Sequence, residues 1–283
     1  MKQIITCFSL LALAACSSSP TKETPQQETK TSTVSEAPRA DMDEFKDLEK
    51  VEPVRPVTPP APSQYASLNE AIKAQNDEKI YQASTQILTQ SPNDARALNA
   101  LAMYHYKRSR FDLCRYLLGK AIAASPKTAE LYSNMGIVQL AQGERRDAIK
   151  SFRKALEINN DEAVAAANLG AIYVQERDYN KANVVLETAY RKGVRDPRVL
   201  NNYAIALTAQ GKLDRAEELY KTSLKDNANN KEVLFNYAIL LVDHMKKYQD
   251  GLEVINRLKF VGGPAESRNR IIALENKAKA GLK

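Results

Sequence analysis

The chain has 283 residues, 43% of them hydrophobic, and a formal net charge of +7 from 41 Lys and Arg against 34 Asp and Glu. This length allows one large domain or two small ones, and the hydrophobic content is sufficient for a folded core. Three cysteines are too few for a disulfide framework, so the fold must be stabilised by packing.

Residues 1–15 are predicted to form a secretory signal, with Lys2 as the charged start and an apolar stretch to residue 15. The stretch is too short to span a bilayer as a helix. The run Leu-Ala-Ala-Cys that ends at Cys16 resembles the lipobox of bacterial lipoproteins, which implies acylation of Cys16 and a stable lipid anchor. In Gram-negative lipoproteins, Ser17 in place of Asp implies transfer to the outer membrane. The alternative is an ordinary signal peptide that ends before a cysteine.

Residues 16–63 are predicted to be a lipidated, disordered tether. Positions 17–63 hold eight of the twelve prolines and a net charge of −3, six Lys and Arg against nine Asp and Glu. Such a composition cannot bury enough apolar surface to offset the entropy of ordering. A plain spacer is the main interpretation. A docking motif and a short helix around residues 42–50 are alternatives.

A 34-residue pattern begins near Ala95 and continues to about Lys246. Its template is residues 129–162, in which apolar residues recur at helical spacing, Gly143 interrupts the run, and a second helical pattern follows. Small residues recur 34 apart in two series: Ala102, Gly136, Gly170, Ala204 and Ala238; and Ala148, Ala182 and Ala216. Each repeat is therefore predicted to be a hairpin of two helices.

This spacing and these small residues resemble the tetratricopeptide repeat. The resemblance implies an all-α solenoid, a right-handed superhelix of about five to six hairpins, over residues 64–264, followed by a capping helix in residues 265–283. In the last repeat one extra residue near His244 to Tyr248 moves Gly251 into the usual alanine position. Cys114 occupies that alanine position in its own repeat, which favours a buried structural role over a reactive one.

Asparagine recurs at one position of four successive first helices, namely Asn134, Asn168, Asn202 and Asn236. An amide has one acceptor and two donors, so a row of amides facing a groove would hold an extended peptide backbone with little regard to its sequence. The pattern resembles the asparagine ladder of O-linked N-acetylglucosamine transferase. Four neighbouring positions are predicted to belong to the same groove: Asn99, Asn201, Arg96 and Arg198. The alternative is that the asparagines are tolerated relics of duplication.

No catalytic residues, metal site or cofactor is expected, because His and Cys are not clustered and no phosphate-binding loop is present. The overall plan resembles outer-membrane lipoproteins of type IV pilotin, Tad pilus assembly and gliding-motility systems. The resemblance implies a non-enzymatic adaptor on the periplasmic face that binds protein or peptide segments of an envelope machine. A scaffold that recruits peptidoglycan hydrolases or synthases is the alternative. Nucleic acid and small-molecule substrates are not expected partners.

Overall fold

The computed structural model describes residues 64–264 and 266–283, and the regular structure in these residues is entirely helical. Cys16, the signal segment and the tether predicted for residues 1–63 lie outside the described residues. Within the described part, every helix is too short or too polar to cross a lipid bilayer.

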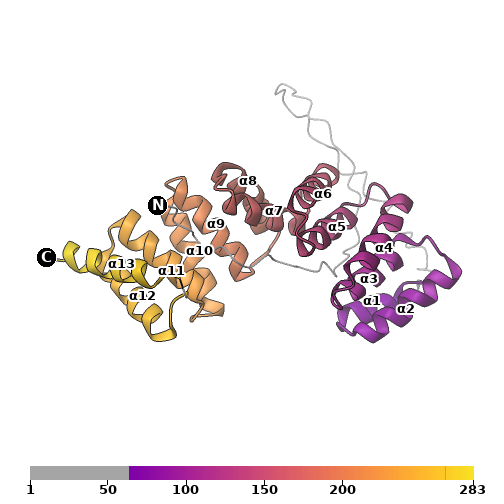
Figure 1. Cartoon of the computed structure of the whole chain (residues 1–283), viewed down its shortest axis with the longest axis horizontal. Coiled ribbons are helices and arrows are strands. Elements are labelled where there is room, and N and C mark those ends of the chain that lie inside the picture. Colours follow the sequence, from indigo (N-terminus) through magenta and orange to yellow (C-terminus); the bar gives the residue numbers. More distant parts are fainter. Residues whose placement is uncertain (1–63, 265) are drawn as a thin grey trace, which may run out of the picture.

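The helices pair into six hairpins that follow one another along the long axis of the molecule, with α1 at one end and α13 at the other (Figure 1). The helices are α1 (Ala66–Lys73), α2 (Asp77–Gln90), α3 (Ala95–Tyr106), α4 (Phe111–Ala124), α5 (Ala129–Ala141), α6 (Arg145–Ile158), α7 (Ala163–Gln175), α8 (Tyr179–Arg191), α9 (Pro197–Ala209), α10 (Leu213–Asp226), α11 (Lys231–Ile239), the π-helix η1 (Leu240–Met245), α12 (Tyr248–Val261) and α13 (Arg268–Gly281). The predicted all-α solenoid is confirmed.

The first helices of the hairpins begin at repeated capping residues. The side chains of Asp94, Glu162, Asp196 and Asn230 each accept a hydrogen bond from a backbone N–H in the first turn, at 2.8, 2.6, 2.8 and 3.1 Å. These side chains satisfy donors that a helix leaves unpaired at its amino end. Thr128 occupies the same position before α5 without a side-chain cap bond.

The two helices of a hairpin approach closely at the small residues of the repeat. A Cβ atom added to Gly136 would lie 2.6 Å from the Phe152 ring, and one added to Gly170 would overlap Leu186. In the second helices the equivalent small side chains are fully buried: Cys114, Ala148, Ala182 and Ala216. The small residues of the sequence pattern therefore mark the helix crossings.

The turn inside each hairpin requires a left-handed residue, which also recurs every 34 positions. Glycine fills it at Gly143 (φ +79°) and Gly211 (φ +74°), whereas Gln75, Ser109 and Arg177 adopt φ between +52° and +60°. Residues with a Cβ pay about 1–2 kcal/mol for this conformation. The hairpin therefore imposes the left-handed conformation at this position even in repeats that have no glycine there.

The extra residue of the last repeat is accommodated as the π-helix η1. The left-handed residue there is Lys246 (φ +59°), one position later than the 34-residue spacing gives. Gly251 takes the alanine position, and a Cβ on it would lie 2.5 Å from Val242 in η1. A π-turn inserts one residue without ending the helix.

Helix α13 is attached to the last hairpin by ion pairs. The Asp243 carboxylate of η1 accepts hydrogen bonds from Arg270 and Lys277, each at 2.5 Å. Glu275 on α13 pairs with Lys259 of α12 at 2.9 Å. The apolar side of α13, which includes Ile271, Leu274 and Ala278, packs on this hairpin.

Replacing Gly143 by Ala tests the left-handed turn. We expect the free energy of unfolding to fall by about 1 kcal/mol, because alanine resists a positive φ more than it restricts the unfolded chain. The matched control is Gly119→Ala in the exposed middle of α4, where nothing lies within 4 Å of an added Cβ. That change should stabilise by about 0.5–1 kcal/mol. Urea titrations that show the same sign for both variants would contradict this account.

Candidate binding face

The first helices of the hairpins form one continuous layer. Helix α3 contacts α5, α5 contacts α7, α7 contacts α9, and α9 contacts α11, whereas within the described residues the second helices make no comparable contacts with each other. An array whose first helices touch and whose second helices diverge curves toward the first helices. We call the surface of this layer, which carries the asparagine series, the inner face.

The four asparagines of the series differ in exposure along the inner face. Asn134 and Asn168 have 0% of their surface exposed and Asn202 has 7%, whereas Asn236 is half-buried. The sequence analysis expected these amides to face a groove, but Asn134, Asn168 and Asn202 are buried and do not present exposed amides there. Because neighbouring first helices touch, these side chains lie between helices. Their role in peptide binding stays a prediction.

Two of the amides form bridges between successive repeats. Asn134 Nδ2 donates to Asn99 Oδ1 at 2.8 Å, and Asn236 Nδ2 donates to Asn201 Oδ1 at 3.0 Å. Both bridges join a ladder residue to the residue just before the ladder position of the preceding repeat. The sequence analysis selected all four residues but did not foresee that they pair.

The bridges occur only where that preceding position is also asparagine. Before Asn168 the position holds Ser133, whose hydroxyl donates to Glu162 at 2.8 Å, and Asn168 Nδ2 donates to the Val164 carbonyl at 2.9 Å. Before Asn202 the position holds an alanine, which offers no side-chain acceptor. The first and last asparagines of the series are therefore bridged, and the two between them are not.

Two acceptor oxygens of the series are left over. Asn134 Oδ1 and Asn168 Oδ1 are buried and have no hydrogen-bond partner among the described residues. A buried polar atom without a partner costs about 1–3 kcal/mol, and such atoms are uncommon in folded proteins.

Carboxylates also belong to the inner face, and the sequence analysis missed them. Glu130 accepts a hydrogen bond from Asn99 Nδ2 at 2.8 Å, and Glu162 accepts from Ser133. Burial raises the pKa of Glu130; the Asn99 hydrogen bond opposes this effect and the nearby Glu162 charge adds to it. Glu130 lies four residues before Asn134, so it would have been found by comparing the positions four residues before each asparagine of the series.

The two predicted basic residues are engaged elsewhere. Arg96 donates to Asn69 and stacks on the Tyr65 ring at 4.9 Å from its centroid, so it faces the first hairpin. Arg198 is exposed and pairs with Asp196, the cap of its own helix, at 3.3 Å. Arg96 is nevertheless close enough to Glu130 for its charge to oppose the rise in the pKa of that carboxyl.

The carboxy-terminal half of the inner face is the more open half. At the position one turn after the asparagines, Met103, Ile137 and Ala171 are buried, whereas Ile205 and Ile239 are partly exposed. Phe235 and the Asn201–Asn236 bridge lie in the same repeats as these two isoleucines, and Phe235 is also partly exposed. This half therefore combines apolar surface with an accessible amide.

Groups suited to catalysis or metal binding do not gather in the described part of the chain. It contains no cluster of three or more His, Cys, Asp or Glu side chains able to hold a metal ion. Burial raises the pKa of the Cys114 thiol to about 12, so this cysteine is unreactive at neutral pH. The arrangement is suited to binding through hydrogen bonds and apolar contact.

Two family models of the tetratricopeptide repeat match adjoining parts of the chain, one at residues 139–205 and one at residues 204–263. Residues 139–263 thus match tetratricopeptide repeats. The hairpins before them share the 34-residue spacing and the small residues at the crossings, and the repeat typically serves as a non-catalytic scaffold for protein interactions.

Curated proteins with similar sequences span several functions. A tetratricopeptide repeat-containing protein of Dictyostelium discoideum is 27% identical over 139 residues, 47% of this chain and 53% of that protein. The type IV pilus assembly protein PilF of Pseudomonas aeruginosa is 24% identical over 143 residues, 50% of this chain and 57% of that protein. The chain thus spans little more than half the length of these two relatives.

Solved tetratricopeptide structures share the fold. YrrB, described as having an unusual peptide-binding site, superposes with a TM-score of 0.57 at 18% identity, covering 71% of this chain and 99% of YrrB. PilW, described as a type IV pilus biogenesis factor, gives 0.54 at 16% identity and covers 78% of this chain and 97% of PilW. At such identities the likeness concerns the fold alone.

His105, in the first helix of its tetratricopeptide repeat, is a buried titratable group behind the inner face. It is 6% exposed, its Nδ1 has no partner among the described residues, and its ring meets Tyr104 edge-on. Burial lowers its pKa below the ordinary 6.5, and the nearby Arg110 and Arg108 charges act in the same direction. The folded state therefore requires a neutral imidazole.

This requirement predicts a loss of stability in mild acid. The unfolded chain binds a proton at this histidine near pH 6.5 and the folded chain only at lower pH, so the stability contribution is complete above 6.5 and declines as the pH falls. His105→Phe should reduce the loss in melting temperature between pH 7.5 and 5.5. The control is His244→Gln, which removes the exposed histidine and should leave that loss unchanged. Equal pH dependence in His105→Phe and the native chain would contradict the assignment.

Proposed function

We propose that this protein is a membrane-anchored, non-catalytic adaptor that binds an extended polypeptide segment along its inner face. The observation that carries the proposal is the Asn201–Asn236 bridge beside partly exposed apolar side chains in the open half of that face. An amide bridge offers further donors and acceptors to a peptide backbone, and the isoleucines offer contact for its side chains.

In the buried half of the inner face a partner would meet carboxylates. Asn134 and Asn168 are fully buried, so their oxygens are closed to an external donor, whereas Glu130 and Glu162 are partly exposed. Neither Glu130 nor Glu162 forms an ion pair with a Lys or Arg side chain of the described residues, so these carboxylates favour a segment with basic side chains at this point.

The cellular role we propose is the assembly of a pilus, secretion or motility machine at the bacterial envelope. Support comes from the sequence likeness to PilF and the shared fold with PilW. The sequence motif at Cys16 supports a lipid anchor, and Ser17 supports the periplasmic face of the outer membrane as the location. The adaptor would hold a component while it inserts or assembles.

A photo-crosslinking amino acid at Ile205 tests the binding face, with the same group at Val184 as control. Val184 is exposed on α8, a second helix, and so lies away from the inner face. We expect envelope proteins to be captured from Ile205 and not from Val184. Pilus or secretin subunits would identify the proposed machine, whereas peptidoglycan hydrolases or synthases would establish the alternative scaffold role. Capture from Val184 alone would refute binding on the inner face.

Paired substitutions test the amide bridge. The double change Asn201→Ala, Asn236→Ala removes both partners at once, so it leaves neither of the two amides unpaired and should change the melting temperature little. We expect capture at Ile205 to fall about tenfold, the loss of two hydrogen bonds of about 0.5–1.5 kcal/mol each. The comparison variant is Asn99→Ala, Asn134→Ala, the same bridge in the buried half, which should leave capture at Ile205 unchanged. Because Asn99 also donates to Glu130, the melting temperature of this variant is measured as well. Undiminished capture in both variants would show that the bridges do not bind the partner.

A further inference from the structure

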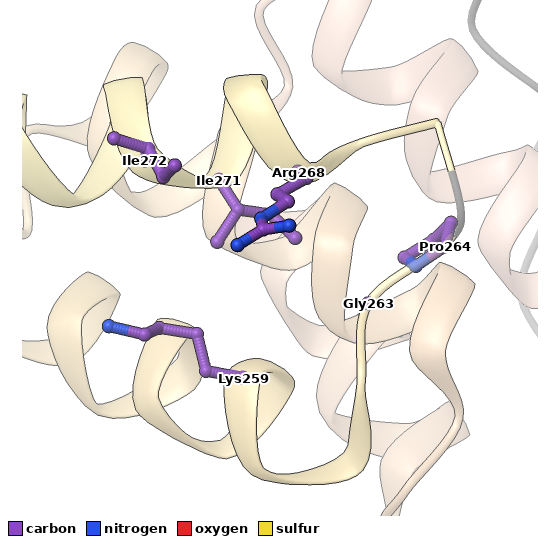
Figure 2. A pocket seen from close by; sticks show the side chains of 6 residues that line it. All are labelled: Lys259, Gly263, Pro264, Arg268, Ile271 and Ile272. Carbon is purple, nitrogen blue, oxygen red and sulfur yellow. The ribbon is translucent and has the colours of Figure 1, made fainter.

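The carboxy-terminal end of the solenoid carries a pocket that the inner face does not include. Helices α12 and α13 and the link between them enclose a volume of about 520 Å³ (Figure 2). The pocket is lined by Lys259, Gly263, Pro264, Arg268, Ile271 and Ile272. Three of these six residues, Pro264 and the two isoleucines, supply apolar side chains.

Exposed apolar side chains lie at the pocket and next to it in sequence. Ile272, which lines the pocket, is 48% exposed, and Phe260, which follows the lining residue Lys259, is 90% exposed. Terminal repeats normally present a polar outer face, because no further repeat covers them. Large exposed apolar residues that gather at one place mark interaction sites, whereas scattered ones do not.

The charges at the pocket leave one cation without a counter-charge. Lys259 is paired with Glu275, and Arg270 and Lys277 are paired with Asp243. Arg268 is exposed and forms no ion pair with a carboxylate of the described residues. Its side chain extends from α13 toward the gap above Lys259 (Figure 2). The pocket therefore suits a ligand with a large apolar side chain beside a carboxylate.

One segment of the chain itself has this chemistry. Residues 41–50, DMDEFKDLEK, contain five Asp and Glu against two Lys, a net charge of −3. Their apolar residues are Met42, Phe45 and Leu48, at intervals of three, a spacing that would put them on one side of a helix formed on binding. Acidic charge and apolar side chains thus match the basic, apolar pocket.

The distance along the molecule favours a neighbouring copy as the source of this segment. Lys50 lies 14 Cα-to-Cα steps before Gln64, where the described residues begin, and these steps reach at most about 50 Å when fully extended. Helix α1 and the pocket lie at opposite ends of the solenoid (Figure 1), separated by six hairpins of roughly 10 Å each. Six hairpins at this spacing span roughly 60 Å, which exceeds the reach of the fully extended linker, so a neighbouring copy is the source of the segment.

We propose that residues 41–50 of one copy dock into the α12–α13 pocket of another. Phe45 or Leu48 fills the space beside Ile272, and an acidic neighbour pairs with Arg268. Such a head-to-tail contact joins two different surfaces, so it links copies into open chains and not into closed dimers. This self-association is independent of peptide binding on the inner face.

The binding step is tested with a fluorescent synthetic peptide of residues 41–50 and the full chain purified in detergent. We expect saturable binding by anisotropy that Arg268→Glu weakens at least tenfold. A negative residue is tolerated at the start of α13, because the amino end of a helix favours it. Arg146→Glu, the same charge change at an exposed site on α6, is the control and should bind normally. A Glu44→Lys, Asp47→Lys peptide should prefer the Arg268→Glu protein.

The association step is tested by sedimentation velocity of the full chain. The native protein should show concentration-dependent association, and Phe45→Ala, Leu48→Ala should abolish it and increase the affinity for added peptide. Absence of peptide binding, or equal binding of a scrambled peptide, would overturn the docking. The neighbouring-copy assignment would be overturned by a different result: the native chain stays monomeric at all concentrations, and its residues 41–50 still block binding of the added peptide.

Discussion

The close approach of two helices inside each hairpin is the constraint on which the structure depends. At Gly136 and Gly170 there is no room for a Cβ atom beside Phe152 and Leu186, and at Gly251 there is none beside Val242. Close approach lets one large side chain fill the crossing and excludes water from it. Each hairpin then has two remaining apolar faces, which only its neighbours can cover.

Stacking under this constraint produces the inner face and also limits it. Because the first helices touch one another, the residues between them are buried against neighbouring side chains. Buried polar side chains need hydrogen-bond partners within the protein. Asn99 and Asn134, and again Asn201 and Asn236, solve this by bridging repeats. The same packing buries the Oδ1 atoms of Asn134 and Asn168 without a hydrogen-bond partner among the described residues. The polar features of the inner face therefore arise from the fold itself.

The last repeat shows how the array ends. One inserted residue becomes η1, which places Asp243 where Arg270 and Lys277 of α13 can reach it. The ion pairs hold α13 across the final hairpin, but its outer side and the end of α12 remain uncovered. The array is thus closed by a helix that stabilises the last repeat while leaving an apolar pocket at the end of the molecule.

Periodicity alone was sufficient to predict the all-α solenoid, the hairpin turns and the crossing points, because each depends on local spacing that recurs every 34 residues. Candidate site residues were also visible as a series, since identical positions in a repeat occupy equivalent places. Which of them are buried was not predictable. Exposure of Asn134 or Asn236, the pairing of Asn99 with Asn134, and the proximity of Glu130 to Glu162 depend on how far one repeat rotates on the next. That rotation is decided by packing between repeats, so only the tertiary structure shows which asparagines are accessible and which carboxylates lie beside them.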